Sequence, residues 1–317
     1  MSTAALEALF PIGGLFFDGS ATNSLLVLHK GKLVYERYAE GWDRDRPNYL
    51  ASATKSVLSA LVGIAISEGY IRGVDQKVID FFPEAVLPPG QESKRDMTIE
   101  HLLTMTSGLG NVYTSYEEFL EFVVQPDIGL AFFMSGQANP PGTKYYYGWD
   151  AQLLGSVLSR AVKRDLFEYA KEKLFGPLGM DSAEWLLFGR NGYDEDGKVI
   201  LFGEDDFTYS TSSGLLLSSG DMLKFGYLYL NYGRWEGKQI VPAEWVARTP
   251  PRTQTPTAYG YLWYNNVLLP FSGAYEARGA AGQWICVLPF LDLVIARAAQ
   301  PGPADEFLWK ISDLFST

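Results

Sequence analysis

Cysteine is almost absent from this chain of 317 residues, in which Cys286 is the single example. A lone cysteine can form no disulfide within the chain, and no cysteine metal cluster can be built from it. Because Cys286 stands in the apolar run 284–288, we expect it to be a buried strand residue.

Histidine is also scarce, with only His29 and His101. Neither has a second histidine or a carboxylate at the spacing of metal ligands, so we expect structural roles for both. The sequence therefore predicts no metal site and no cofactor. It also lacks the Gly-x-Ser-x-Gly motif, which argues against an α/β-hydrolase.

Positive charge and long apolar runs are in short supply. The net charge is -11, which argues against nucleic acids and anionic membranes as partners. No apolar run approaches the length that crosses a bilayer. Residues 1–17 contain no lysine or arginine and so lack the basic head of a secretory signal. We expect a cytoplasmic protein, or a mature exported protein whose signal has been removed.

The most informative positive feature is Ser52 followed three residues later by Lys55, a spacing that no other lysine of the chain shares. On a helix, residues three apart lie on one face, so the lysine amine can approach the serine hydroxyl. A neutral amine can take the hydroxyl proton and create a nucleophile. The setting supports this chemistry, because residues 56–66 are apolar on nearly every side and predict a buried helix. Burial disfavours the charged form of lysine.

Strand patterns gather at the two ends of the chain and helical patterns in the middle. We expect an α+β fold, in which an antiparallel sheet built from both termini is flanked by helices and carries an inserted, mainly helical lobe. The sheet lobe would comprise about 1–75 and 212–317, and the helical lobe about 76–211. The expected elements are a hairpin at 23–38, helices at 53–69, 98–106, 115–124, 150–163, 165–174, 220–232 and 303–316, and strands at 259–266, 283–288 and 291–297.

Several motifs together resemble the serine β-lactamase and penicillin-binding-protein superfamily, and within it class C-like esterases and 6-aminohexanoate-oligomer hydrolases. Residues 52–56 (SATKS) are similar to its nucleophile motif, and 98–109 to the helix and turn that follow. Residues 141–147 (PGTKYYY) are similar to its tyrosine loop, and residues 220–226 and 237–242 also resemble sequence segments that are common in the family. The resemblance covers most of the chain and implies a β-lactamase-like fold.

The resemblance assigns a catalytic tyrosine six residues after the proline of Pro-Gly. Counting from Pro141 gives Tyr147, with Tyr146 one residue away as the alternative. A phenol or phenolate at this place can move a proton between Ser52 and the leaving group. Two other Tyr-x-Asn matches, at 229–231 and 264–266, fall in an expected helix and strand and are discounted.

The sequence departs from the family pattern at two places. Trp149 stands where the family has the asparagine or serine that helps to hold a substrate amide. Lys-Thr-Gly is missing, and residues 277–283 stand in its place. Aligning Gly279 with the motif glycine makes the backbone N–H of Ala280 the second oxyanion donor, beside that of Ser52. Arg278 could substitute for the absent lysine or face solvent.

The function expected from this set is hydrolysis of a small ester or amide through an acyl-enzyme, with a carboxylesterase as the preferred class. Ser52, Lys55 and Tyr147 would be catalytic, Ser52 and Ala280 would supply the oxyanion donors, and Trp149, Arg278 and Gly279 would contact substrate. A β-lactamase or D-amino-acid peptidase is the alternative, and a non-catalytic binding member of the fold is a second one. The sequence does not determine the oligomeric state.

Overall fold

The computed structural model describes residues 22–110, 125, 127–188, 191–193, 199–201, 208–249, 259–265 and 273–299. The predicted helices at 115–124 and 303–316 lie outside these residues. Among the described residues, no helix combines the length and apolar character that crossing a bilayer requires.

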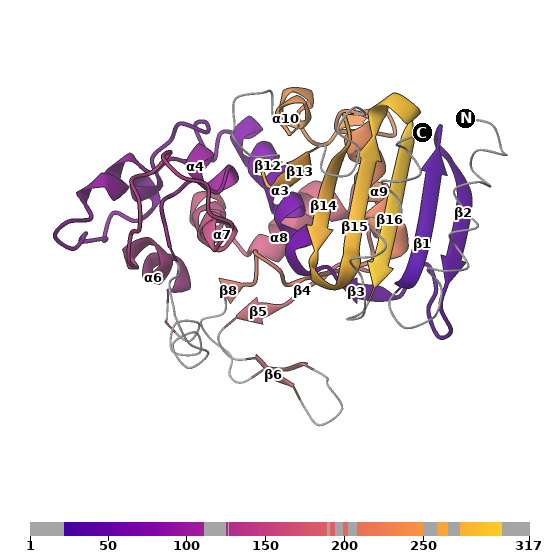
Figure 1. The fold of residues 1–317 in the computed structure, drawn as a ribbon, viewed down its shortest axis with the longest axis horizontal. Helices are drawn as coiled ribbons and strands as arrows, with labels where there is room; N and C mark the ends of the chain where they lie inside the picture. The colour runs from indigo at the N-terminus through magenta and orange to yellow at the C-terminus, as the bar shows by residue number, and fades with distance from the viewer. Residues whose placement is uncertain are drawn as a thin grey trace.

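A seven-stranded antiparallel sheet, counted over the described residues, joins strands from both ends of the chain (Figure 1). Its two long neighbours β15 and β16 bury every residue, as expected of strands covered on both faces. β16 pairs with β1 along the strand, so that Leu26 lies opposite Ala296. In spatial order the strands are β12 (Tyr259–Gly260), β13 (Trp263–Asn265), β14 (Tyr275–Gly279), β15 (Gln283–Leu288), β16 (Leu293–Ala299), β1 (Thr22–His29) and β2 (Lys32–Tyr38).

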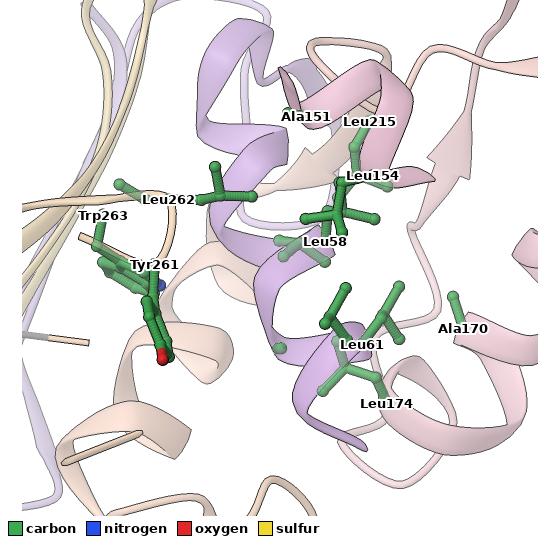
Figure 2. Close-up of a cluster of buried hydrophobic side chains, with 14 of the residues drawn as sticks. Leu58, Leu61, Ala151, Leu154, Ala170, Leu174, Leu215, Tyr261, Leu262 and Trp263 are labelled. Carbon is green, nitrogen blue, oxygen red and sulfur yellow. The ribbon is translucent and has the colours of Figure 1, made fainter. Parts of the chain in front are cut away.

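Helix α3 (Thr54–Ser67) is buried along almost its whole length, which explains why its sequence is apolar on every side. Figure 2 shows Leu58 and Leu61 facing Leu154 and Leu174, while Leu262 approaches the helix from the opposite side. The helix ends as the sequence predicts, since Gly69 adopts a φ of 80°. α3 therefore stands between the sheet and the helices formed by residues 99–175 (Figure 1).

Three of the four helices that follow α3 in the described part of the middle segment begin at polar side chains that cap their first turns. The side chains of Thr98, Asp127 and Asp165 each accept a hydrogen bond from the backbone N–H three residues later. His101 completes the cap of the first of these helices through its Nδ1 atom, a structural role. The helices are α4 (Ile99–Leu103), α6 (Ile128–Met134), α7 (Asp150–Val162) and α8 (Leu166–Ala170), the last continued by a π-helical turn at Lys171–Phe175.

Helix α9 (Ser219–Leu230) covers one face of the sheet, where it contacts β1, β15 and β16. Ser218 caps its first turn by accepting a hydrogen bond from the N–H of Asp221 at 3.1 Å. Helix α10 (Ala243–Arg248) places the ring of Trp245 against Gly63 of α3, where a Cβ atom would lie 2.5 Å from the indole. Glycine at position 63 therefore permits this close contact.

Short strands complete the described fold. β9 lies between β3 and β4, and the other short strands form hairpins or two-stranded ladders. They are β3 (Pro47–Tyr49), β4 (Glu184–Trp185), β5 (Leu187–Phe188), β6 (Asn191–Tyr193), β7 (Val199–Leu201), β8 (Thr208–Tyr209), β9 (Leu215–Ser218), β10 (Arg234–Trp235) and β11 (Lys238–Gln239).

The predicted α+β class, with a sheet from both ends of the chain, is confirmed. Two details were wrong. The run 259–266, expected as one strand, contains two strands and a turn, because Tyr261 and Leu262 both adopt positive φ angles of 47° and 64°. The end of the middle segment, expected to be mainly helical, forms the short strands β4 to β8 between residues 184 and 209. The division into two lobes stays a prediction.

Candidate active site

Ser52 lies in a 3₁₀ turn, Ala51–Ala53, that leads directly into α3. Lys55 lies in the first turn of α3, three residues after Ser52, so the two side chains share one face. The preceding residue, Ala51, has a φ of 47°, in the left-handed region that alanine rarely adopts. Ser52 is therefore presented at a sharp, strained entry to the buried helix.

The structure brings Lys55 within hydrogen-bond distance of Ser52. Its Nζ atom lies 2.9 Å from Ser52 Oγ and 2.7 Å from the backbone carbonyl oxygen of Ser212. Lys55 is 4% exposed, and this burial lowers the pKa of its amine to about 7. Near neutral pH, a large part of the amine is thus uncharged and able to accept a proton.

The Tyr147 ring faces the same amine, since Lys55 Nζ lies over it at 5.0 Å from the centroid. Burial raises the pKa of the Tyr147 phenol, and hydrogen bonding to Ser52 and then to Tyr264 offsets part of that rise. The phenol therefore keeps its proton near neutral pH. Of the two candidate tyrosines, Tyr147 stands beside Lys55, while Tyr146 is 37% exposed.

Further tyrosine rings surround Tyr147. The Tyr259 ring meets it edge-on with centroids 5.6 Å apart, and the Tyr264 ring stacks on it at 6.0 Å. Tyr145 contacts Tyr259 with centroids 5.8 Å apart. The sequence interpretation discounted the Tyr-x-Asn match at Tyr264, yet its ring lies against the candidate catalytic tyrosine. These rings form an aromatic wall next to Ser52.

Gly279 ends strand β14 against the backbone that leads into Ser52. A Cβ atom at position 279 would lie 2.1 Å from the carbonyl oxygen of Leu50, so only glycine permits this approach. Ala280 follows at the start of a 3₁₀ turn, Ala280–Gly282. The chain segments that carry the two expected oxyanion donors therefore run side by side.

Arg278, one residue earlier, forms an ion pair with a neighbour on its own strand. Its Nε atom lies 2.5 Å from a carboxylate oxygen of Glu276, which is fully buried. The same carboxylate oxygen accepts a hydrogen bond from the Trp284 indole at 3.0 Å. The guanidinium also lies over the Tyr264 ring, 5.4 Å from its centroid. Its charge is thus already compensated within the protein.

Trp149 directly precedes α7, and its ring stacks on that of Phe132 of α6, with ring centroids 5.5 Å apart. It thereby anchors the start of α7, directly after the tyrosine loop. Apart from Ser52, the polar contact of the Lys55 amine is made with the Ser212 backbone carbonyl. No side-chain pattern in the sequence could have identified a backbone acceptor of this kind.

No group of three or more His, Cys, Asp or Glu side chains within the described ranges could hold a metal ion. Cys286 is buried on β15, which agrees with the role expected from its apolar surroundings.

The amino-acid sequence of this chain is similar to those of known proteins. The family described as Beta-lactamase matches residues 18–308. The acyltransferase mokF of Monascus pilosus is 30% identical over 161 residues, which are 45% of this chain and 39% of that enzyme. The chain thus matches about two fifths of the length of this curated relative.

Solved structures share the fold over nearly the whole chain. EstCE1, described as a hydrolase with promiscuous acyltransferase activity, superposes with a TM-score of 0.75 and 16% identity, covering 100% of both chains. A Bacillus anthracis protein, provisionally described as a 6-aminohexanoate-dimer hydrolase, superposes with a TM-score of 0.72 and 20% sequence identity. The match covers 96% of this chain and 80% of that one. At these identities the likeness concerns the fold alone.

Proposed function

The chain belongs to the beta-lactamase family, and from that premise we propose that it is a serine hydrolase that cleaves a small ester or amide through an acyl-enzyme. The observation that carries this proposal is the buried Lys55 amine, 2.9 Å from Ser52 Oγ, with its pKa lowered to about 7 by desolvation. A neutral amine at this distance can serve as the general base that a serine nucleophile requires.

The protonation states suggest how the two groups divide the work. The Lys55 amine accepts the proton of the Ser52 hydroxyl as Oγ attacks the substrate carbonyl. The Tyr147 phenol, whose pKa is raised by burial, then gives a proton to the leaving group as the carbon–heteroatom bond breaks. Lys55 returns its proton to Tyr147, and the acyl group remains on Ser52.

The second half of the cycle reverses these roles with water. Water gives a proton to the same pair of groups and attacks the acyl-enzyme, and Ser52 Oγ takes a proton as it leaves. The backbone N–H groups of Ser52 and Ala280 stabilise the oxyanion of both tetrahedral intermediates in this proposal. The close approach of Gly279 to Leu50 supports the pairing of these two donors.

We propose an ester with an apolar acyl or leaving group as the substrate class. The rings of Tyr145, Tyr147, Tyr259 and Tyr264 offer an apolar surface beside the nucleophile. Arg278 is paired with Glu276, so it is a poor anchor for the carboxylate of a β-lactam or a peptide.

Esters are therefore expected to be better substrates than β-lactams. Two residues expected to anchor a β-lactam are replaced. Trp149 stands in place of the residue that holds the substrate amide, and Arg278, which could substitute for the lysine of Lys-Thr-Gly, is paired with Glu276. Losing the hydrogen bond to the charged carboxylate costs roughly tenfold to a hundredfold, and losing the one to the neutral amide up to about tenfold, so kcat/KM should favour esters by about 10–10³. The measurement compares a short-chain aryl ester with a chromogenic cephalosporin, with Ser52→Ala as the blank for both. Equal efficiencies would refute the ester proposal and favour the β-lactamase alternative.

Tyr147→Phe should lower kcat by about 10²–10⁴ because a general acid–base group is lost. The melting temperature should hardly change, since the ring and its aromatic contacts remain. Tyr146→Phe is the matched control and should be mild. Steady-state kinetics and thermal melts of both variants check this prediction. A reversed order of effects would move the catalytic role to Tyr146.

Acyl transfer to an alcohol is a second candidate function. Both mokF and EstCE1 are described with acyltransferase activity, and an alcohol can replace water in the deacylation step. Product analysis with an added primary alcohol distinguishes the two activities. A transfer enzyme forms the new ester as the main product, whereas a hydrolase releases mainly the free acid.

A further inference from the structure

The second partner of Lys55 determines which way its amine points. A neutral amine has two N–H donors and one lone pair, and only the lone pair can accept the Ser52 proton. The Ser212 carbonyl, 2.7 Å from Nζ, takes one N–H. This contact fixes the rotation of the amine, so that its lone pair can face Ser52 Oγ at 2.9 Å.

The backbone segment that carries the Ser212 carbonyl is in turn held by the side chain of Gln152 on α7. Gln152 Nε2 donates to the carbonyl of Tyr209 at 2.8 Å. Its Oε1 accepts from the N–H of Thr211 at 2.9 Å and from that of Ser212 at 3.3 Å. The side chain is fully buried, and these partners define its amide orientation, because a flipped amide would face two N–H donors with its own NH₂ group.

Two other contacts tie the same segment to α7. Thr211 Oγ1 donates to the carbonyl of Ala151 at 3.0 Å. Gly155 lies so close to Thr211 that a Cβ atom would be 2.1 Å from its hydroxyl. On the other side, the N–H of Leu215 donates to Thr54 Oγ1 of α3 at 3.1 Å. Residues 209–215 are therefore clamped between the helix of Lys55 and the helix that follows the tyrosine loop.

We propose that Gln152 is a positioning residue for the proton transfer, which holds the Ser212 carbonyl against Lys55 and so aims the amine at Ser52. The proposal rests on the function proposed above. It makes α7 the element that aligns both proton-transfer groups, since Tyr147 precedes its first residue, Asp150, by three positions.

Gln152→Met keeps the volume of the side chain and removes its three hydrogen bonds. The Ser212 carbonyl then loses its alignment, and kcat should fall by about tenfold to a hundredfold with little change in KM. The carbonyl acceptor favours the ammonium form of Lys55, so its loss should lower the pKa of Lys55 further. The acid limb of the rate profile should therefore move to lower pH, by about one unit.

Other ionisable groups near Lys55 must be separated from this effect. Tyr147 faces the amine, Tyr259 of β12 and Tyr264 of β13 contact the Tyr147 ring, and Arg278 of β14 lies over the Tyr264 ring. On α7, burial raises the pKa of Asp150 to about 7. The profile is therefore measured in the Asp150→Asn background as well, where the remaining acid limb belongs to Lys55.

The test compares kcat, KM and the pH profile of the full chain in wild type, Gln152→Met and Gln152→Glu. At this fully buried position the glutamate should be protonated, so that it keeps both acceptor contacts, donates its O–H to the Tyr209 carbonyl and restores most of kcat. Gln76→Met is the matched control, because Gln76 is another buried glutamine, whose Oε1 accepts from the N–H of Arg72 at 2.8 Å. It should keep the kcat and acid limb of wild type.

A folded Gln152→Met enzyme with an unchanged acid limb and unchanged kcat would overturn the proposal. If this variant does not fold, Thr211→Val, which releases the same segment from Ala151, carries the test, and an unchanged limb and kcat there would equally overturn it. The proposed function fails in a different way, namely if wild type itself neither hydrolyses esters nor forms a phosphonate adduct.

Discussion

Ser52→Ala is expected to abolish turnover, with a loss in kcat on the order of 10⁶, the size found when a nucleophilic serine is removed from a hydrolase. The reason is geometric, since Ser52 Oγ is the hydroxyl that lies 2.9 Å from the buried Lys55 amine. Replacing a hydroxyl by hydrogen leaves little void, so the fold should remain intact.

The measurement combines ester hydrolysis with mass spectrometry after a fluorophosphonate probe. Wild type should carry the probe on Ser52, and the alanine variant should carry none. Ser67→Ala is the matched control, because Ser67 ends the same helix and only donates to the Ile64 carbonyl at 2.8 Å. Near-normal turnover in pure Ser52→Ala protein, or a probe mapped elsewhere, would remove Ser52 as the nucleophile.

Lys55→Arg should be nearly inactive, with a fall in kcat of about 10²–10⁴ for the loss of a general base. A guanidinium does not release its proton in the accessible pH range, so it cannot take one from Ser52. Lys55→Ala should be as poor. Positive charge is retained in the first variant and lost in the second, so the pair separates proton transfer from electrostatics.

The wild-type rate should rise with pH through about 7, the pKa of the buried amine. Below this pH Lys55 is an ammonium ion and cannot accept a proton, and above it the amine is free. The Asp150 carboxyl also titrates near 7, so Asp150→Asn shows which limb belongs to Lys55. Substantial activity in Lys55→Arg would move the general-base role to Tyr147 alone.

The parts of the candidate site that the sequence predicted depend on local geometry or on a counted motif. Ser52 and Lys55 are three residues apart, so their contact follows from the helical turn itself. Tyr147 followed from its distance to Pro141, and its ring does lie beside Lys55. Neither prediction needed information about the packing of distant segments.

The parts that the sequence did not predict depend on long-range packing. The Ser212 carbonyl is 157 residues from Lys55, and a backbone oxygen has no side-chain signature. The ion pair of Arg278 with Glu276 is different, because residues two apart on a strand lie on the same face of the sheet. This contact could therefore have been predicted from the sequence.

The turn between β12 and β13 shows why a strand was expected there. Tyr261 and Leu262 are residues that rarely adopt positive φ, so neither of these two residues marks a turn in the sequence. Tertiary contacts stabilise it instead. The N–H of Leu262 donates to the carbonyl of Leu103 at 3.0 Å, and its carbonyl accepts from Ser56 Oγ at 2.7 Å.

The pairing of β1 with β16 has a consequence for the order of folding. Residues 22–29 leave the ribosome well before their partners at 293–299. The hairpin of β1 and β2 must wait for the intervening chain, with the β1 edge that β16 will occupy still unpaired. Contacts of such long sequence separation form slowly, because the loop between them must first be closed. We therefore expect sheet closure to be a late step, and the growing chain to expose an edge open to chaperones and to aggregation.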